Sequence, residues 1–87
     1  MQHFIHLHGQ DNVVIALKNF REGESITLNG KSIQLLSVIN FGHKIAIETI
    51  PENGKVLKYG LPIGSATQEI KPGEHVHSHN LKTDYKH

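Results

Sequence analysis

The stretch GEHVHSHN, residues 73–80, places histidines at positions 75, 77 and 79 of a chain that holds eight histidines in all. On a β-strand, residues two apart project from the same face, so His75, His77 and His79 would lie together, opposite Val76. Neutral imidazole binds zinc, iron and copper, and it also contacts acidic or hydroxylated ligands. Three interpretations stay open for this face: a solvated strand edge, a contact surface for an acidic or polyol ligand, and a metal site.

The same alternation occurs near the start of the chain. His6 and His8 would share one face of a first strand, with Ile5 and Leu7 on the other. If the first and last strands lie close together, five imidazoles converge.

Two further motifs carry polar groups at turns. In NFGHKIAI, His43 and Lys44 follow Gly42 at the start of a strand, where a proton-transfer group and a fixed cation would meet an anionic substrate. A solvated turn explains this pair equally well. In KYGLPIG, Lys58 and Tyr59 precede a loop constrained by two glycines and a proline, and taken alone this motif is structural rather than a phosphate cradle.

Short strands must position these residues, because turn signals recur along the whole chain. The segments ALKNFREGESI, AIETIPENGKVL and ATQEIKPGEHV share an alanine, an apolar residue, a glycine and another apolar residue. The second segment has one additional residue before Gly54, so its last apolar member would be Leu57. Asn29-Gly30 between β-formers predicts a hairpin, and Asp11 and Asn12 are ordinary turn formers. We therefore expect an all-β fold with strands near residues 3–8, 12–19, 25–28, 31–36, 44–49, 55–58, 63–68 and 74–79.

Composition narrows the classes of protein. With 87 residues and 37% apolar residues, the chain is sized for one domain, predicted over residues 1–80 with a polar tail at 81–87. A formal charge of +1 without a basic cluster argues against nucleic acid as a partner, and the lack of cysteine excludes disulfides, thiolate metal sites and a cysteine nucleophile. The sequence shows no signal-peptide pattern and no run near the ~20 apolar residues of a membrane span, so we expect no membrane partner and a cytoplasmic location.

Four motifs, DNVVIAL, GHKIAI, LKYGLPIGSA and GEHVHSHN, occur in an order and at spacings that resemble the N-terminal domain of altronate dehydratases. The resemblance extends over nearly the whole chain and implies a small SAF-type domain of β-clip fold, related in shape to the antifreeze-like domain of sialic acid synthases. Enzymes of this family remove water from hexonic or hexaric sugar acids, and sulfolactate sulfo-lyase is a relative that eliminates sulfite. The resemblance therefore implies a lyase.

The resemblance also implies partners and site residues. It suggests the separate small subunit of a two-subunit sugar-acid dehydratase, with a large catalytic subunit that supplies most ligands of a divalent iron or manganese ion. Carried over onto this sequence, the polar members of the motifs imply a substrate-binding surface made by His43, Lys44, Lys58, Tyr59, His75, His77, His79 and Asn80. No residue of this chain is assigned as a catalytic base or a metal ligand, and we expect the isolated chain to bind metal weakly.

Other functions fit the same residues. The chain could be the small subunit of a sulfolactate sulfo-lyase, a stand-alone β-clip module that binds a sugar or an anion without turnover, or a metal-binding scaffold that uses the histidine face. A large dehydratase-like subunit encoded beside this chain would favour the enzyme over the binding module.

Overall fold

The computed structural model describes residues 3–84, and every regular element within that range is a β-strand. This confirms the predicted all-β fold. The strands are β1 (Phe4–Ile5), β2 (Val13–Ala16), β3 (Ser25–Leu28), β4 (Lys31–Gln34), β5 (Lys44–Ala46), β6 (Lys55–Lys58), β7 (Leu61–Ala66), β8 (His75–Val76) and β9 (Leu81–Lys82).

Residues 3–84 contain no helix long and apolar enough to cross a membrane.

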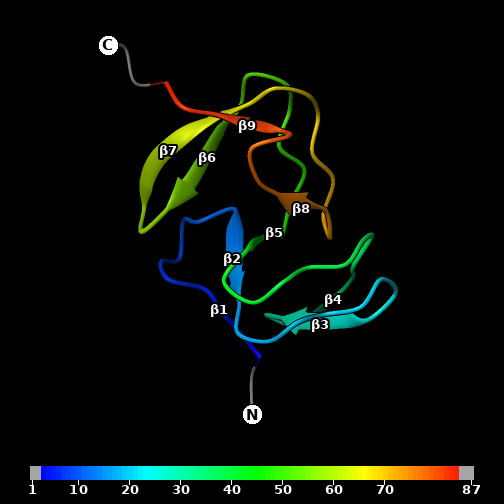
Figure 1. The fold of residues 1–87 in the computed structure, drawn as a ribbon. Coiled ribbons are helices and arrows are strands. Elements are labelled where there is room, and N and C mark those ends of the chain that lie inside the picture. Colours follow the sequence, from blue (N-terminus) through cyan, green and yellow to red (C-terminus); the bar gives the residue numbers. More distant parts are fainter. Residues whose placement is uncertain (1–2, 85–87) are drawn as a thin grey trace.

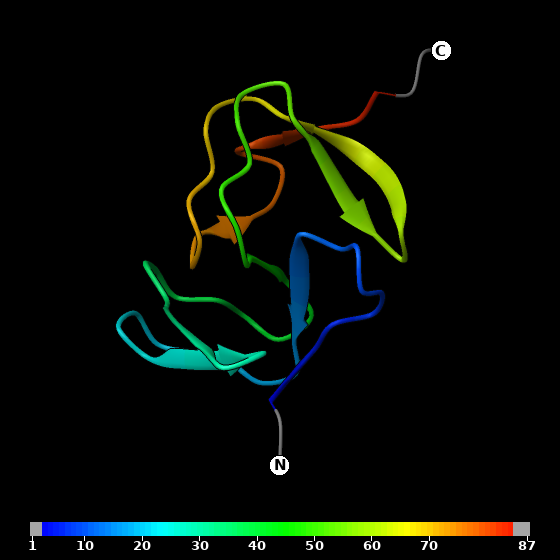
Figure 2. The same ribbon diagram turned by 180° about the vertical axis from the view of Figure 1, so that it is seen from behind.

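The strands form three small antiparallel sheets (Figure 1). The central sheet has the order β1-β2-β5-β8, so β1 and β8 are its two opposite edges. The hairpin β3-β4 lies at one end of the molecule, and the sheet β6-β7-β9 lies at the other, as the reverse view also shows (Figure 2). The predicted Asn29-Gly30 hairpin is confirmed, because both residues have positive φ, 52° and 79°, between β3 and β4.

A repeated pattern of four residues organises these sheets, and it occurs four times rather than three. Each copy has an apolar residue, a second one four positions later, a turn residue with positive φ three positions later, and a final apolar residue after three more. The copies are Ala16, Phe20, Gly23 and Ile26; Leu35, Ile39, Gly42 and Ile45; Ala46, Ile50, Asn53 and Val56; and Ala66, Ile70, Gly73 and Val76. All twelve apolar members are buried.

The sequence interpretation of the third copy, the segment AIETIPENGKVL, was wrong in one respect. It placed Gly54 at the turn after one additional residue, whereas Asn53 has the left-handed backbone, with φ 67°. Asparagine tolerates this conformation better than other residues with a side chain, so the third copy has the same spacing as the others. Its final apolar residue is consequently Val56, which is fully buried, rather than Leu57.

The four copies pair two by two through their backbones. Phe20 and Ile39 exchange two hydrogen bonds of 2.8 and 3.1 Å, and Ile50 and Ile70 exchange two of 2.8 Å. The amide of each turn residue also donates to the first residue of the paired copy, in the pairs Gly23–Leu35, Gly42–Ala16, Asn53–Ala66 and Gly73–Ala46. The fold is thus two interlocked pairs of the same unit.

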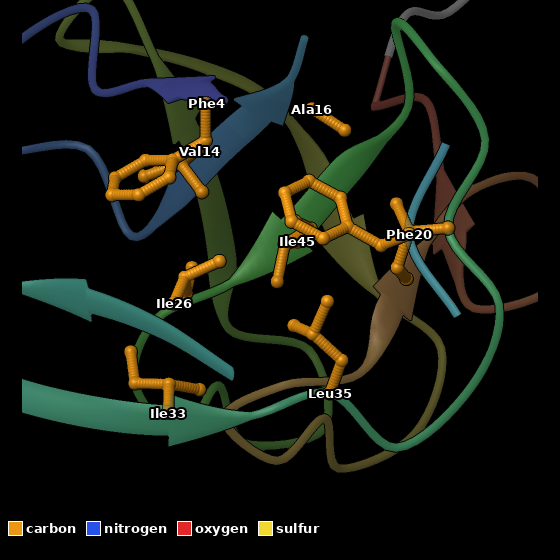
Figure 3. Packing of buried hydrophobic residues seen from close by; sticks show 9 residues of the cluster. Phe4, Val14, Ala16, Phe20, Ile26, Ile33, Leu35 and Ile45 are labelled. Carbon is orange, nitrogen blue, oxygen red and sulfur yellow. The ribbon is translucent and has the colours of Figure 1, made fainter. Parts of the chain in front are cut away.

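Two apolar clusters lie on either side of the central sheet. Neighbouring residues of one strand alternate between faces, so Val14 and Ile45 join one cluster while Val13 and Ala46 join the other. Figure 3 shows the first cluster, where side chains from β2 and β5 meet those of the β3-β4 hairpin. The rings of Phe4 in β1 and of Phe20, between β2 and β3, also belong to this cluster. This double core fixes β5 and β8, which carry the polar site.

The predicted polar tail, residues 81–87, is partly integrated into the domain. Leu81–Lys82 form β9, which pairs with β7. Asp84 pairs with Lys55 at 2.7 Å and accepts a hydrogen bond from Ser65, and the hydrogen bond from Lys55, followed by that from Ser65, lowers the pKa of its carboxyl group. Residues 85–87 lie outside the described residues.

Candidate functional site

Four histidine rings gather at one edge of the central sheet. The Nδ1 atom of His43 and the Nε2 atom of His75 are 2.7 Å apart and share a hydrogen bond. His77 stacks on His43 with 4.6 Å between ring centroids, and His79 lies at a tilt against His75 at 5.3 Å. His43 and His75 are half-buried, whereas His77 and His79 are exposed. The cluster therefore has an inner hydrogen-bonded pair and an outer, solvent-facing pair.

Strand pairing brings these rings together from distant parts of the chain. His75 in β8 is the register partner of Ile45 in β5, and His43 lies just before β5. Gly42, with φ 84°, turns the chain so that His43 enters beside β8. The prediction of a common face for the three C-terminal histidines is met only in part by strand geometry, because β8 ends at Val76 and residues 77–79 form a turn.

Asn80 holds this turn rather than lying on its surface. Its side chain is fully buried, accepts a hydrogen bond from the His77 amide at 2.9 Å and donates one to the His75 carbonyl at 2.9 Å. These two hydrogen bonds engage both ends of the carboxamide with the backbone that carries the rings. Asn80 is consequently a positioning residue, although the sequence placed it among the substrate contacts.

The expected convergence of five imidazoles is wrong. His6 donates to the Asp11 carbonyl at 2.9 Å, and His8 accepts a hydrogen bond from the Gln10 amide at 3.0 Å, on β1's side of the sheet. Because β1 and β8 are opposite edges, neither ring joins the cluster. His43 takes their place, since it reaches β8 through β5.

Two lysines add positive charge to the same region. Lys44 is half-buried in β5, and its burial, together with the charge of Lys58, lowers the pKa of its ammonium group. Burial also lowers the pKa of His75, and the neighbouring imidazoles and Lys44 lower it further. Lys44 and His75 each disfavour the positive charge of the other, so a bound anion would stabilise the protonated form of both. The electrostatics suit a carboxylate or sulfonate ligand.

The loop that carries Lys58 and Tyr59 is anchored from beneath. The buried Asp11 carboxylate accepts hydrogen bonds from the amides of Tyr59 at 2.9 Å and Gly60 at 2.7 Å. The Asn12 side chain likewise accepts a hydrogen bond from the amide of Leu57 in β6. Sequence reasoning missed this role, because an Asp-Asn pair before a strand looks the same whether it forms a local turn or a distant anchor. Tyr59 itself is 63% exposed, with Lys58 Nζ 5.8 Å from its ring.

A hollow adjoins the histidines. It has a volume of about 630 Å³ and is lined by Leu36, Ser37, Val38, Glu74, His75 and His79. One wall is apolar, because Leu36 and Val38 are 48% and 58% exposed. The site thus combines imidazoles with an open, partly apolar surface that another chain or a ligand could cover.

The inner pair and the exposed ring of His77 together fit a metal ion. One ligand atom from each of His43, His75 and His77 lies within 4.8 Å of the others, and these are the side chains of residues 3–84 that group in this way. Three imidazoles are a donor set that suits divalent iron or zinc.

Comparison with known proteins decides the family. Residues 2–84 match the model of the altronate/galactarate dehydratase SAF domain. The chain belongs to this family. The resemblance seen in the sequence motifs is therefore confirmed.

Relatives of this SAF domain are named as lyases. The chain is 49% identical over 84 residues to altronate dehydratase of Bacillus subtilis (strain 168), covering 97% of the chain and 17% of that protein. It is 46% identical over 50 residues to the (2R)-sulfolactate sulfo-lyase subunit alpha of Chromohalobacter salexigens, covering 58% of the chain and 53% of that subunit. The galactarate dehydratase (L-threo-forming) of Escherichia coli (strain K12) is 36% identical over 70 residues, 80% of the chain and 13% of that enzyme. The SAF chain spans less than a fifth of the dehydratases it matches.

Proposed function

We propose that the chain is the small subunit of a two-subunit sugar-acid dehydratase and that its histidine and lysine side chains bind the substrate at a shared active site. The observation that carries this proposal is the cluster of four imidazoles near Lys44, which in turn lies near Lys58. Two of the rings, His75 and His79, line the open hollow. The family and the dehydratase names of its relatives supply the reaction class.

The chemistry is a β-elimination. A base removes the proton α to a carboxylate, a cation stabilises the resulting enediolate, and an acid donates a proton to the departing β-hydroxyl group. In this chain Lys44, half-buried near Lys58, supports the substrate carboxylate electrostatically. The exposed rings of His77 and His79 are placed to donate hydrogen bonds or a proton to hydroxyl groups.

A divalent iron or manganese ion in the assembled enzyme would polarise the carboxylate and lower the energy of the enediolate. The grouping of three imidazoles supports the proposal that this chain contributes donors to such an ion. We propose that a large catalytic subunit supplies the base and further ligands. The name "subunit alpha" of two sulfo-lyase relatives supports a multi-subunit arrangement.

A second function has its own observation. The match to the sulfo-lyase subunit includes 53% of that subunit, a larger share of the relative than any of the dehydratase matches reaches. In that case the same elimination would expel sulfite from sulfolactate instead of water from a sugar acid. A binding module that holds the acid without turnover is the third possibility.

Reconstitution separates these functions. The chain would be co-expressed with a large dehydratase-like subunit from the same genome, and the purified complex screened against hexonic acids, hexaric acids and sulfolactate. We expect the two subunits to co-purify and the complex to dehydrate a sugar acid. This activity should be lost when the present chain is omitted. Release of sulfite from sulfolactate alone would select the second function. Acid binding by the chain with turnover that is indifferent to its presence would contradict a subunit role.

A further inference from the structure

His43, His75 and His77 form a compact group of nitrogen donors within this chain alone. We propose that the isolated chain binds one divalent transition-metal ion on these three imidazoles, with the remaining coordination positions open to water or to an acidic ligand. The inference deepens the proposed function, on which it rests for the ion of the assembled enzyme, but the binding site itself needs only residues of this chain.

The spacing of the donor atoms supports the site. Zinc binds imidazole nitrogen at about 2.0–2.1 Å, so two ligand nitrogens of a tetrahedral site lie about 3.3 Å apart. The present His43–His75 separation of 2.7 Å is shorter, because those two nitrogens share a hydrogen bond, and all three donors lie within 4.8 Å. Metal binding would require the first distance to lengthen and the longer ones to shorten, each by less than about 2 Å.

The surroundings hold the donors in place. His43 follows the fixed turn at Gly42, and His75 lies in β8 paired to β5. His77 begins the turn whose backbone is bound by the buried Asn80 side chain. Two of the three ligands are thus on rigid backbone, and the third is exposed and adjustable.

The donor set also selects the kind of ion. Three neutral nitrogen atoms without thiolate suit zinc, cobalt, iron, nickel and copper, whereas calcium and magnesium prefer oxygen. Three protein ligands plus an open position is the arrangement of catalytic rather than structural metal sites. The sequence alone predicted weak binding, because no cysteine or carboxylate lies beside the histidines to complete a closed site and further ligands were expected from a large subunit. The approach of His43, 32 positions from His75, supplies that third donor.

Titration of the tag-free chain tests the inference. We expect Co²⁺ to bind in a ratio of one ion per chain, with visible absorption bands of a low-coordinate site, and Zn²⁺ to displace it. His43→Ala and His77→Ala should each weaken binding by more than the roughly 10- to 100-fold that loss of an outer-shell partner brings. His79→Ala is the matched control, because this exposed ring lies in the same turn and contacts His75 but is outside the donor group.

A second measurement guards against misfolded variants. Zn²⁺ should raise the melting temperature of the parent chain and of His79→Ala, since a ligand that binds only the folded state stabilises it, and should leave His77→Ala unshifted. Circular dichroism would verify that each variant is folded. Three outcomes would overturn the site: no stoichiometric binding by the folded parent chain, equal affinity in parent and His77→Ala, or equal losses in His77→Ala and His79→Ala.

Discussion

The double variant His77→Ala, His79→Ala is expected to lower turnover of the assembled enzyme by about 100-fold or more while leaving the fold intact. Both rings are exposed, and the turn that carries them is held by Asn80 and the backbone rather than by the imidazoles. The free energy of unfolding should therefore change by less than about 1 kcal/mol. Turnover of the two-subunit enzyme and a thermal melt of the small chain are the two measurements.

A matched control uses a histidine outside the cluster. His3 is also exposed and lies just before β1, at the opposite edge of the central sheet from β8, and His3→Ala should leave turnover unchanged. Normal turnover by the double variant in a fully assembled enzyme would indicate that the outer rings form only a solvated surface. A large loss of melting temperature would instead make them structural.

Gly73→Ala is expected to destabilise the chain by about 2–5 kcal/mol, the sum of backbone strain and overpacking. Gly73 is buried with φ 90°, and an added Cβ would overlap the backbone carbonyl of Gln34 at the end of β4. That carbonyl belongs to a strand and has little freedom to move. Urea unfolding of parent and variant measures the difference.

The internal repeat supplies the control for this substitution. Gly23 is the equivalent turn residue of the first copy, with φ 91°, and has no atom within 4 Å of an added Cβ. Gly23→Ala should therefore lose only the left-handed strain, about 1–2 kcal/mol. Equal losses of unfolding free energy at the two positions would contradict the expected steric overlap with the Gln34 carbonyl.

Local signals in the sequence were sufficient for most of the fold. Asn29-Gly30 specified a hairpin because both positions need positive φ, and three copies of the repeat were visible from their alanine and glycine. The fourth copy was missed because Leu35 takes the place of alanine, although its spacing is the same. Asn53 was misassigned because a glycine follows it directly. Both errors arose because the repeat was identified by residue type. What the four copies share is the spacing of their apolar residues and a turn residue with positive φ.

The site was predictable in its residues but not in its geometry. Alternation at positions 75, 77 and 79 indicated a histidine face, yet the face depends on a turn, which strand periodicity does not describe. The contact of His43 with His75 requires the pairing of β5 with β8, a long-range event with no local signature. The burial of Asn80 and Asp11 likewise follows from tertiary packing, since in sequence each looks like a turn former.

Histidine footprinting in the assembled enzyme tests the central claim, that this imidazole face lies at an active site shared with a catalytic partner. Diethylpyrocarbonate would be applied to the free chain, to the complex, and to the complex with sugar acid, and modification of each histidine read by mass spectrometry. The account predicts that His77 and His79, exposed in this structure, become protected on assembly and more so with substrate. Modification of both rings at the same rate in all three states would contradict it.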